Sequence, residues 1–332
     1  MTDAAPIWIS EAEVVSMMDM GEAIEALEKG LAAEAEGNAQ NMIKTHVAWG
    51  KASNLHAMGA VFAKAGYVGT KTWAHTPEGA APVLVLYNSA SGALKAVIEA
   101  YALGQLRTGA ASGVATRWLA GPNAAELAII GTGRHALAQV GAVAAVRPIK
   151  RVRIFGPSQP HRELFALRVQ NEFDLEVLAA RSVAEAIEGA SVITVVTRAT
   201  EPVVSARMIA RGAHINAVGA IVRTSAEING DVLARCDRVI TDSVPSAQRL
   251  ARELIDYFGP EERDWGPVQS LAQLLSNRAS RRVGEDITLF KSLGVGISDL
   301  ALGIALYERA RRLDLGRRLP EQKRVAPRLR KS

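Results

Sequence analysis

Six short apolar runs recur through the second half of the sequence, and segments with helical character separate them. The runs cover residues 128–130, 152–155, 175–178, 192–196, 215–218 and 239–241. Strands that alternate with helices at this spacing are typical of a parallel sheet with helices on both faces. Six strands is the full complement of a dinucleotide-binding fold. The pattern therefore predicts an α/β protein with a Rossmann-type, doubly wound parallel sheet.

A glycine-rich turn follows the first of these runs and opens a helical segment. It has the pattern GxGxxA and consists of Gly131, Thr132, Gly133, Arg134, His135 and Ala136. In this pattern the first glycine allows a tight turn, the second lets the backbone approach a diphosphate, and the small last residue lets helix and strand pack closely. Because a helix start offers free amides to an anion, we expect these six residues to bind a dinucleotide cofactor.

The end of the second expected strand bears on the choice of cofactor. Sites that prefer NAD usually place an acidic residue there to bind the ribose, but residues 156–159 contain none. Ser158, His161 and Arg162 are candidates to face a 2′-phosphate, or else Ser158 only caps the next helix and Arg162 is solvated. The sequence thus favours NADP(H) and leaves NAD(H) open.

The first part of the chain has a different pattern. Ser10 with Glu13, and Asp19 with Glu22, have the spacing of capping boxes and predict two helix starts. Short extended segments between about 41 and 100 predict an antiparallel sheet, followed by a helix from about 102 to 120. A last long helix is expected from about 298 to 312, crossing back onto this sheet.

We therefore predict two domains: an α+β domain made of residues 1–121 and 298–332, and the dinucleotide-binding domain at 122–297. Within the second domain, Ser182, Ser205 and Thr224 are expected helix starts, the last with Glu227 as its capping partner. The chain beyond about 250 looks irregular, with a strand over 289–297 that glycines interrupt.

Composition excludes several classes of protein. With 48% hydrophobic and 22% charged residues, the 332-residue chain is that of a globular protein. It has no apolar run long enough to cross a membrane. The net charge of +5 resides largely in a basic tail without interleaved aromatic residues, so no nucleic-acid partner is expected. The single Cys236 suits a reducing compartment, and we expect a cytoplasmic protein. The six histidines show no metal-ligand spacing, so no metal site is expected.

Several segments, in this order and spacing, resemble the ornithine cyclodeaminase/mu-crystallin family. They are residues 69–73 (GTKTW), 105–112 (QLRTGAAS), 129–133 (IIGTG), 215–220 (INAVGA) and 290–294 (FKSLG). The resemblance covers nearly the whole chain. It implies a homodimer in which an N-terminal substrate and dimerisation domain, completed by the C-terminal helix, is joined to a Rossmann domain. Family activities include cyclodeamination of ornithine and lysine, alanine dehydrogenation and ketimine reduction, and mu-crystallin also binds thyroid hormone.

The resemblance also assigns roles to residues. Arg107 stands where the family has an arginine that grips the substrate carboxylate, and Lys71 where it has an active-site lysine. Lys44 is a weaker candidate for a second carboxylate contact. The nicotinamide ring of the cofactor is expected near Gly219 and the turn from Ser292 to Gly294, and Thr197 and Val218 are further expected contacts of the cofactor.

One departure from the family pattern concerns the reaction. Cyclodeaminases carry an aspartate shortly after the Val-Gly-Ala turn, whereas here Ile221, Val222 and Arg223 follow it. This favours a reductase or dehydrogenase for a small α-imino or α-amino acid with an apolar or acidic side chain. Arg223 and His75 are hypothetical contacts for a second carboxylate. An NAD-dependent lyase acting on ornithine and a non-enzymatic binding protein remain the alternatives.

Overall fold

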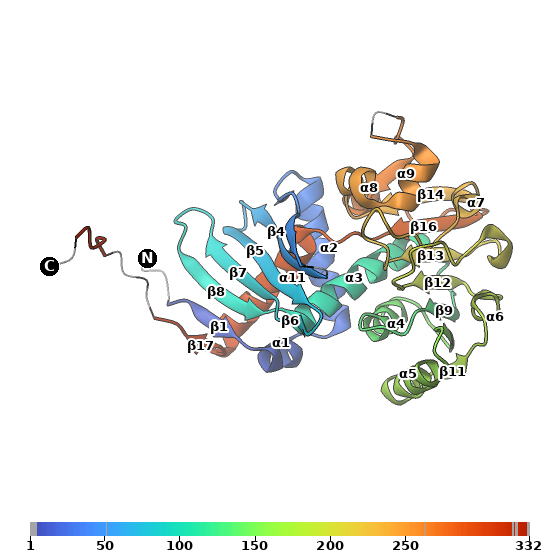
Figure 1. The fold of residues 1–332 in the computed structure, drawn as a ribbon, viewed down its shortest axis with the longest axis horizontal. Coiled ribbons are helices and arrows are strands. Elements are labelled where there is room, and N and C mark those ends of the chain that lie inside the picture. Colours follow the sequence, from blue (N-terminus) through green and yellow to red (C-terminus); the bar gives the residue numbers. More distant parts are fainter. Residues whose placement is uncertain (1–4, 51, 262, 321, 323–324, 331–332) are drawn as a thin grey trace.

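The computed structural model describes residues 5–50, 52–261, 263–320, 322 and 325–330, and it contains two sheets (Figure 1). The first sheet has nine strands, with the path β17-β1-β8-β7-β5-β4-β2, and β3 and β6 pair with β4 and β5. Its elements in chain order are β1 (Ile7–Ile9), α1 (Glu11–Met17), α2 (Met20–Ala35), β2 (Gln40–Asn41), β3 (Thr45–Trp49), β4 (Ser53–Phe62), β5 (Tyr67–Thr76), β6 (Gly79–Ala80), β7 (Val83–Asn88), β8 (Leu94–Glu99), α3 (Tyr101–Leu119), α11 (Gly296–Leu313) and β17 (Arg317–Arg318).

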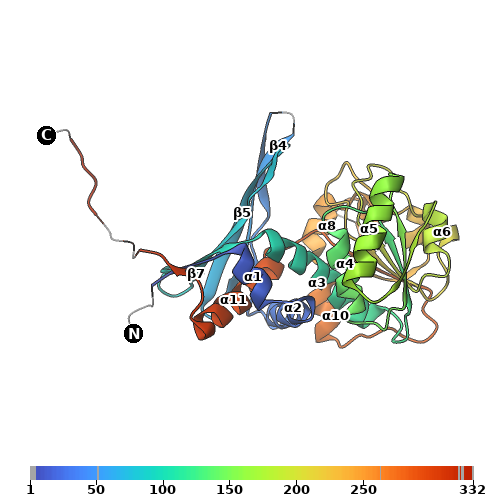
Figure 2. The same ribbon diagram turned by 90° about the horizontal axis from the view of Figure 1, so that it is seen from below.

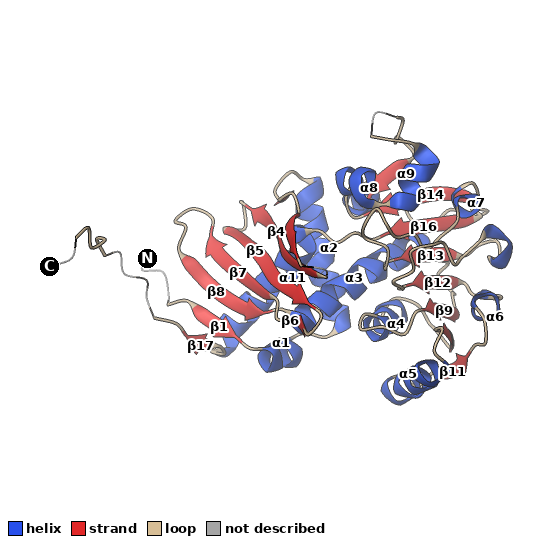
Figure 3. Ribbon diagram, in the orientation of Figure 1, coloured by secondary structure: helices blue, strands red, loops and turns tan. Residues whose placement is uncertain are grey.

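The second sheet has eight parallel strands in the order β11-β10-β9-β12-β13-β16-β14-β15. Helices cover both of its faces, which confirms the doubly wound α/β prediction (Figure 3). Its elements are β9 (Glu126–Ile130), α4 (Ala136–Ala144), β10 (Arg151–Phe155), α5 (Gln159–Glu172), β11 (Glu176–Ala179), α6 (Val183–Ile187), β12 (Val192–Val195), the 3-10 turn η1 (Ala206–Met208), β13 (His214–Ala217), α7 (Gly230–Leu233), β14 (Cys236–Thr241), α8 (Val244–Leu250), α9 (Arg252–Phe258), β15 (Val268–Ser270), α10 (Leu271–Ser276) and β16 (Ile287–Lys291).

All six expected strands form, but the edge of the sheet differs from the prediction. β16 lies between β13 and β14, and the described residues between 251 and 295, expected to be irregular, contain two helices and two strands. Every residue of β16 is buried. Strands that are buried on both faces are typical of the interior of a parallel sheet, so an internal position with a paired strand on each side is favoured for β16. Its glycines do not interrupt it: the strand ends at Lys291, Gly294 lies in the connection to α11, and Gly296 is the first residue of that helix.

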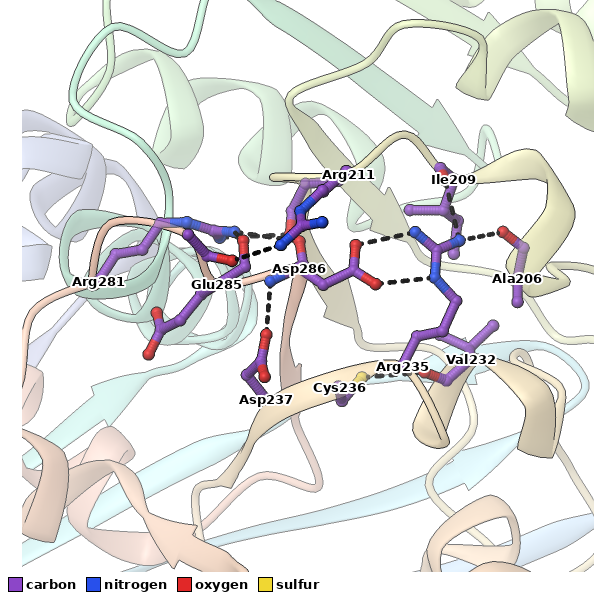
Figure 4. Close-up of polar contacts among 12 residues, drawn as sticks. Ala206, Ile209, Arg211, Val232, Arg235, Cys236, Asp237, Arg281, Glu285 and Asp286 are labelled. Atoms are coloured by element: carbon purple, nitrogen blue, oxygen red, sulfur yellow. Dashed lines mark hydrogen bonds and ion pairs between the residues drawn. The ribbon is translucent and has the colours of Figure 1, made fainter.

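A polar cluster fixes the beginning of β16 beside β14 (Figure 4). Arg235 donates two hydrogen bonds to the Asp286 carboxylate, from Nε at 3.0 Å and from Nη2 at 2.8 Å, and Asp286 N donates to Asp237. Such a bidentate pair restrains both partners in orientation as well as distance. The cluster therefore sets the position of β16 next to β14, far from the carboxyl ends of the strands.

Helix starts were predicted with mixed success. Ser10 and Asp19 form complete capping boxes with Glu13 and Glu22, as expected. Ser182 caps α6, but Ser205 precedes only the single turn η1. The helix expected at Thr224 is absent from the described residues, because the Glu227 side chain accepts hydrogen bonds from backbone amides of other loops instead of capping a helix.

Helix α11 returns to the first sheet, as predicted, and packs on β4, β5 and β7. Seen from below, α1, α2, α3 and α11 all lie on one side of this sheet, and none of the described helices covers its other face (Figure 2). The long helix α3 also contacts α4, β13 and β16, so it joins the two sheets. The predicted domain boundaries fall between α3 and β9 and within the first turn of α11. No described helix is long and apolar enough to cross a membrane.

Candidate active site

A cleft of about 670 Å³ lies between the two sheets. On one side it is bounded by segments that follow the carboxyl ends of β9, β13, β14 and β16, which is where parallel sheets bind ligands. On the other side it is bounded by β3, β4, β5 and the first turns of α3. The residues used below that line it are Asn41, Lys44, His46, His56, Lys71, Trp73, His75, Arg107, Arg134, His135, Ile221, Val222 and Gly294.

Two cations share one buried carboxylate in this cleft. Lys71 Nζ, on β5, makes a short ion pair with Asp299 Oδ1, on α11, and Arg107 Nε, on α3, lies 3.3 Å from the same oxygen. Lys71 and Asp299 are both buried, and Arg107 is largely so. One carboxylate cannot neutralise two cations, so the cluster keeps a positive charge that suits a substrate carboxylate.

Sequence reasoning missed Asp299 as a site residue. It stood at the expected start of the last helix, where an acidic residue is the ordinary complement of the helix dipole. Asp299 lies 228 positions from Lys71 in the chain. Only the return of α11 to the first sheet brings them together, and no local pattern carries that information.

The pKa of Lys71 is lowered to about 8. Burial is the main cause, and the positive charges of Arg107 and Lys44 add to it, whereas Asp299 opposes the shift. A lysine with this pKa exchanges its proton close to neutral pH, as a general acid or base must. The site therefore combines a fixed cation with a cation that can titrate.

Of the three weaker candidates for substrate contacts, Lys44 and His75 line the cleft and Arg223 does not. Lys44 lines the cleft, and burial together with the charge of Arg107 lowers its pKa. His75 lines the cleft near its rim. Arg223 is exposed and is not among the lining residues, whereas Ile221 and Val222 before it are. The structure thus gives no support to Arg223 as a substrate contact.

Stacked rings form a flat wall beside Lys71. His56 stacks on Trp73 with centroids 4.7 Å apart and on His46 at 5.7 Å, and Lys71 Nζ lies 5.1 Å from the Trp73 ring centroid. Burial, with the charge of Lys44, lowers the pKa of His56 to about 4, so this ring is neutral at physiological pH. The wall offers apolar area to a substrate, a feature that the sequence did not indicate.

The glycine loop has the geometry that a dinucleotide requires. Gly131 has φ +113°, and a Cβ there would lie 2.5 Å from Val196 O, so no other residue fits. A Cβ at Gly133 would meet nothing within 4 Å, so this backbone is open to a diphosphate. His135 and Ala136 begin α4 directly behind. These residues fit a nucleotide diphosphate at the start of that helix.

Arg134 and His135, the two basic residues of this loop, both have neighbours that affect their role. The Arg134 guanidinium lies 5.7 Å from the Tyr101 ring centroid. Burial, with the charge of Arg107, lowers the pKa of His135 to about 4. The ring of His135 beside the loop is therefore neutral at physiological pH.

Beyond β10, the two phosphate candidates behave differently. Ser158 is the N-cap of α5, but its hydroxyl makes no capping hydrogen bond. Arg162 is buried, its Nη1 donates to Gly156 O at 2.7 Å, and it stacks on Phe155 at 5.7 Å. The alternative of a solvated Arg162 is wrong, and its use as a phosphate ligand finds no support because its side chain is committed to the β10–α5 turn.

The turn from Ser292 to Gly294 presses against Arg107. Asp242, buried at the end of β14, accepts hydrogen bonds from Leu293 N at 2.9 Å, Gly294 N at 2.7 Å and Ser292 Oγ at 3.3 Å. Gly294 has φ +81°, and a Cβ there would lie 2.5 Å from Arg107 Nη1. Sequence reasoning missed Asp242, which holds this turn and so limits where the guanidinium can lie.

We expect Gly294→Ala to lower kcat/KM at least tenfold, because the new methyl group displaces Arg107. The strained backbone also lowers the free energy of unfolding by about 1–3 kcal/mol. Gly92→Ala is the matched control: Gly92 has φ +70° and open space around it, so only stability should fall. Kinetics and urea denaturation of both variants check this, and unchanged kinetics in Gly294→Ala would contradict it.

Among the described residues, no group of three or more His, Cys, Asp or Glu side chains is arranged to hold a metal ion.

Comparisons with known proteins agree with this architecture. The model of the ornithine cyclodeaminase/mu-crystallin family matches residues 6–313. A Δ1-pyrroline-2-carboxylate reductase of Bacillus cereus is 32% identical over 71% of this chain and 73% of its own length. The Thermococcus litoralis Δ1-pyrroline-2-carboxylate reductase, solved with NADH and L-proline, superposes with a TM-score of 0.88 at 27% identity, covering 94% of this chain and all of that one.

An archaeal alanine dehydrogenase dimer with bound NAD superposes with a TM-score of 0.87 at 25% identity, over 95% of this chain and 99% of the other. The family match covers both sheets and both sides of the cleft. The chain therefore belongs to the ornithine cyclodeaminase/mu-crystallin family.

Proposed function

We propose that this chain is a nicotinamide-dependent reductase of small α-imino acids, which also runs in reverse as an amino acid dehydrogenase. The observation that carries the proposal is the cluster of Lys71, Arg107 and Asp299 in the same cleft as the glycine loop. The relatives named as pyrroline-2-carboxylate reductases support it. Residues 1–121 and 298–332 would supply the substrate side, and residues 122–297 the cofactor side.

Arg107 holds the substrate carboxylate in this proposal. A guanidinium pairs with a carboxylate through two parallel hydrogen bonds and so fixes its orientation. Lys44, on the same side of the cleft, adds a second positive charge. The flat wall of His56 and Trp73 accommodates the apolar part of the substrate.

Lys71 transfers the proton to and from the substrate nitrogen in this proposal. A bound nicotinamide cofactor supplies the hydride that C2 of the substrate receives. Lys71 Nζ donates a proton to the substrate nitrogen, so that the C=N bond becomes an amine, and it takes the proton back in the reverse direction. Asp299 Oδ1 holds Nζ in place and favours its charged form.

The lyase alternative lacks its base. Ile221 and Val222 line the cleft after the Val-Gly-Ala turn, and neither side chain can activate a substrate's side-chain amine. The binding-protein alternative is disfavoured because Lys71, Arg107 and Asp299 form an intact ionic site.

The cofactor is proposed to be NAD(H) or NADP(H), held at its diphosphate by residues 131–136. The relatives of known structure were solved with NADH and NAD. The stretch after β10 has no acidic residue that would repel a 2′-phosphate, and Ser158 has a free hydroxyl there. Thr197, Val218, Gly219, Ser292 and Gly294 are proposed to surround the nicotinamide end.

A panel of imino acids tests the function. Purified protein should oxidise NADPH or NADH, followed by absorbance, with cyclic imino acids or with 2-oxo acids plus ammonia or methylamine. Ornithine should release no ammonia. Ammonia release from ornithine without net change in nicotinamide absorbance would overturn the proposal in favour of the lyase. No reaction together with tight cofactor binding would favour the binding protein.

The pH dependence should differ between the two directions. Reduction needs the Lys71 ammonium as proton donor, so kcat/KM for the imino acid should fall as pH rises through about 8. Oxidation needs the neutral amine, so kcat/KM for the amino acid should rise through the same range. Initial rates at several pH values in each direction check this, and parallel profiles would contradict it.

We also propose that the protein is a homodimer that pairs through the helix-free face of the first sheet. Val68, Val85, Tyr87 and Val97 are neighbours on this face and only partly covered. A contiguous apolar patch on a sheet face is typical of a protein interface. The alanine dehydrogenase relative is a dimer. A cytoplasmic location is proposed as well, since Cys236 is a half-buried free thiol.

Val85→Arg should convert the dimer to a particle of one 35.3 kDa chain, because the buried charge opposes pairing. Light scattering after size exclusion measures this. Leu164→Arg, at an exposed position of α5, is the matched control and should stay dimeric. A wild-type monomer, or a dimer that Val85→Arg leaves intact, would contradict the proposed interface.

A further inference from the structure

We propose that Glu227 is a positioning residue that sets where the nicotinamide end of the cofactor lies, by clamping the loops after β12 and β13. This inference rests on the proposed function. It concerns a residue for which the sequence indicated only a helix cap, and which lines no part of the cleft. Its evidence is a set of hydrogen bonds in the buried layer beneath the loops.

The Glu227 carboxylate binds two loops at once. Oε1 accepts hydrogen bonds from Thr197 N at 2.7 Å and Thr197 Oγ1 at 2.9 Å, after β12. Oε2 accepts from Gly219 N at 2.7 Å and Ala220 N at 3.1 Å, after β13. Four donors saturate both oxygens, so this one side chain fixes the spacing of the two loops.

A buried ion pair supports the backbone of Glu227. Lys291 Nζ, at the end of β16, lies 3.0 Å from Glu253 Oε1, and Glu227 N donates to the same oxygen at 3.4 Å. All three side chains are buried. Because removal of one member of such a network leaves the others without partners, the network resists change and keeps Glu227 in a single orientation.

The two loops that Glu227 joins are in direct contact at Gly219. A Cβ on Gly219 would lie 2.0 Å from Thr197 O and 2.6 Å from Glu227 Oε1. The two loops therefore touch backbone to backbone, and Gly219 is the residue that allows it. Two and three positions further on, Ile221 and Val222 line the same cleft as Lys71, so the clamped turn leads directly into the site.

The position of these loops in the sheet assigns them to the nicotinamide. The strand order reverses between β9 and β12, and a dinucleotide straddles that point with its diphosphate on α4. The β10 side of the sheet then receives the adenosine. The β12 and β13 side, where Lys71 and Arg107 face the cleft, receives the reactive ring.

The clamp also determines what the turn can offer a ligand. Glu227 occupies the amide hydrogens of Gly219 and Ala220. Among the described residues, no donor reaches the carbonyl oxygens of Val218 or Gly219. The turn therefore presents acceptors, which match the N–H donors of a carboxamide and not an anion. We infer that the carbonyl oxygens of Val218 and Gly219 accept hydrogen bonds from the nicotinamide carboxamide.

Glu227→Gln separates this role from a general structural one. Glutamine has one acceptor oxygen, and its NH2 group would face the amide hydrogens of one loop, so that loop must move. Binding of NADH and of ADP-ribose, which lacks the nicotinamide, is measured by calorimetry on wild type and variant. The Kd for NADH should rise at least tenfold, while the Kd for ADP-ribose should stay within twofold. If the wild type prefers NADPH, the 2′-phosphorylated pair of ligands is used.

Glu185→Gln, at a partly exposed position of α6, is the matched control and should leave both Kd values unchanged. If Glu227→Gln does not fold, Glu227→Asp provides the same comparison with a shorter reach. Equal loss of both ligands, or no loss of either, overturns the inference. A wild type that binds neither ligand refutes the proposed function itself, so the two failures are distinguishable.

Discussion

Arg107→Ala is expected to lower kcat/KM for imino acid reduction by roughly 10²–10³-fold, with little change in the Kd of the cofactor. Truncating one partner of a buried hydrogen-bonded charge pair costs about 2–5 kcal/mol, and here the pair is the guanidinium and the substrate carboxylate. Arg107 is held between Asp299, 3.3 Å from its Nε, and the Gly294 turn, so it is ordered before substrate arrives. Steady-state kinetics and a cofactor titration give both numbers.

Arg107→Lys is the control for charge without the planar fork. It should recover part of the lost efficiency, since an ammonium attracts the carboxylate but cannot hold it with two parallel bonds. An Arg107→Ala enzyme within a few-fold of wild type would show that the carboxylate binds elsewhere, with Lys44 as the first candidate.

Lys71→Met is expected to lower kcat by about 10²–10⁴-fold, the usual worth of a positioned general acid. Methionine keeps the length and apolar part of the side chain, so the packing of β5 should be preserved. Asp299 retains Arg107 as an ionic neighbour in this variant. What remains of the activity should lose the pH dependence near 8, because the group that titrates there is gone. A Lys71→Met enzyme that keeps the wild-type pH profile would contradict the assignment.

Asp299→Asn distinguishes positioning of Lys71 from direct chemistry. Asp299 raises the pKa of Lys71 against the effect of burial, so its neutralisation should move the pH limb of reduction to lower pH. The amide can still accept a hydrogen bond from Nζ. A shifted limb with a modest loss of kcat is therefore the expected result, and an unshifted limb would mean that Lys71 does not produce it.

Local patterns predicted much of this molecule. The glycine loop at 131–136 and the two capping boxes at Ser10 and Asp19 depend on residues close together in the chain, and all of them form. The six apolar runs all form strands, because strand formation depends mainly on the apolar residues of the run itself and on an adjacent strand to pair with. The return of α11 was predictable because the first domain otherwise has too little helix to cover its sheet.

Contacts between distant segments were not predictable in the same way. The insertion of β16 depends on Asp286 meeting Arg235, which lies on a different element. Asp299 reaches Lys71 only after α11 has packed on the first sheet. Glu227 had the spacing of a helix cap after Thr224, but the loops after β12 and β13 offered its carboxylate four donors, and those outweigh one capping bond.

The most direct test of the account follows an isotope from cofactor to product. The wild-type enzyme is given cofactor deuterated at C4 on the transferred face, together with a cyclic imino acid, and the amino acid formed is analysed by mass spectrometry and NMR. We expect one deuterium at C2 of the product for each cofactor oxidised. Product without deuterium, or conversion of ornithine with release of ammonia and no oxidised cofactor, would contradict it.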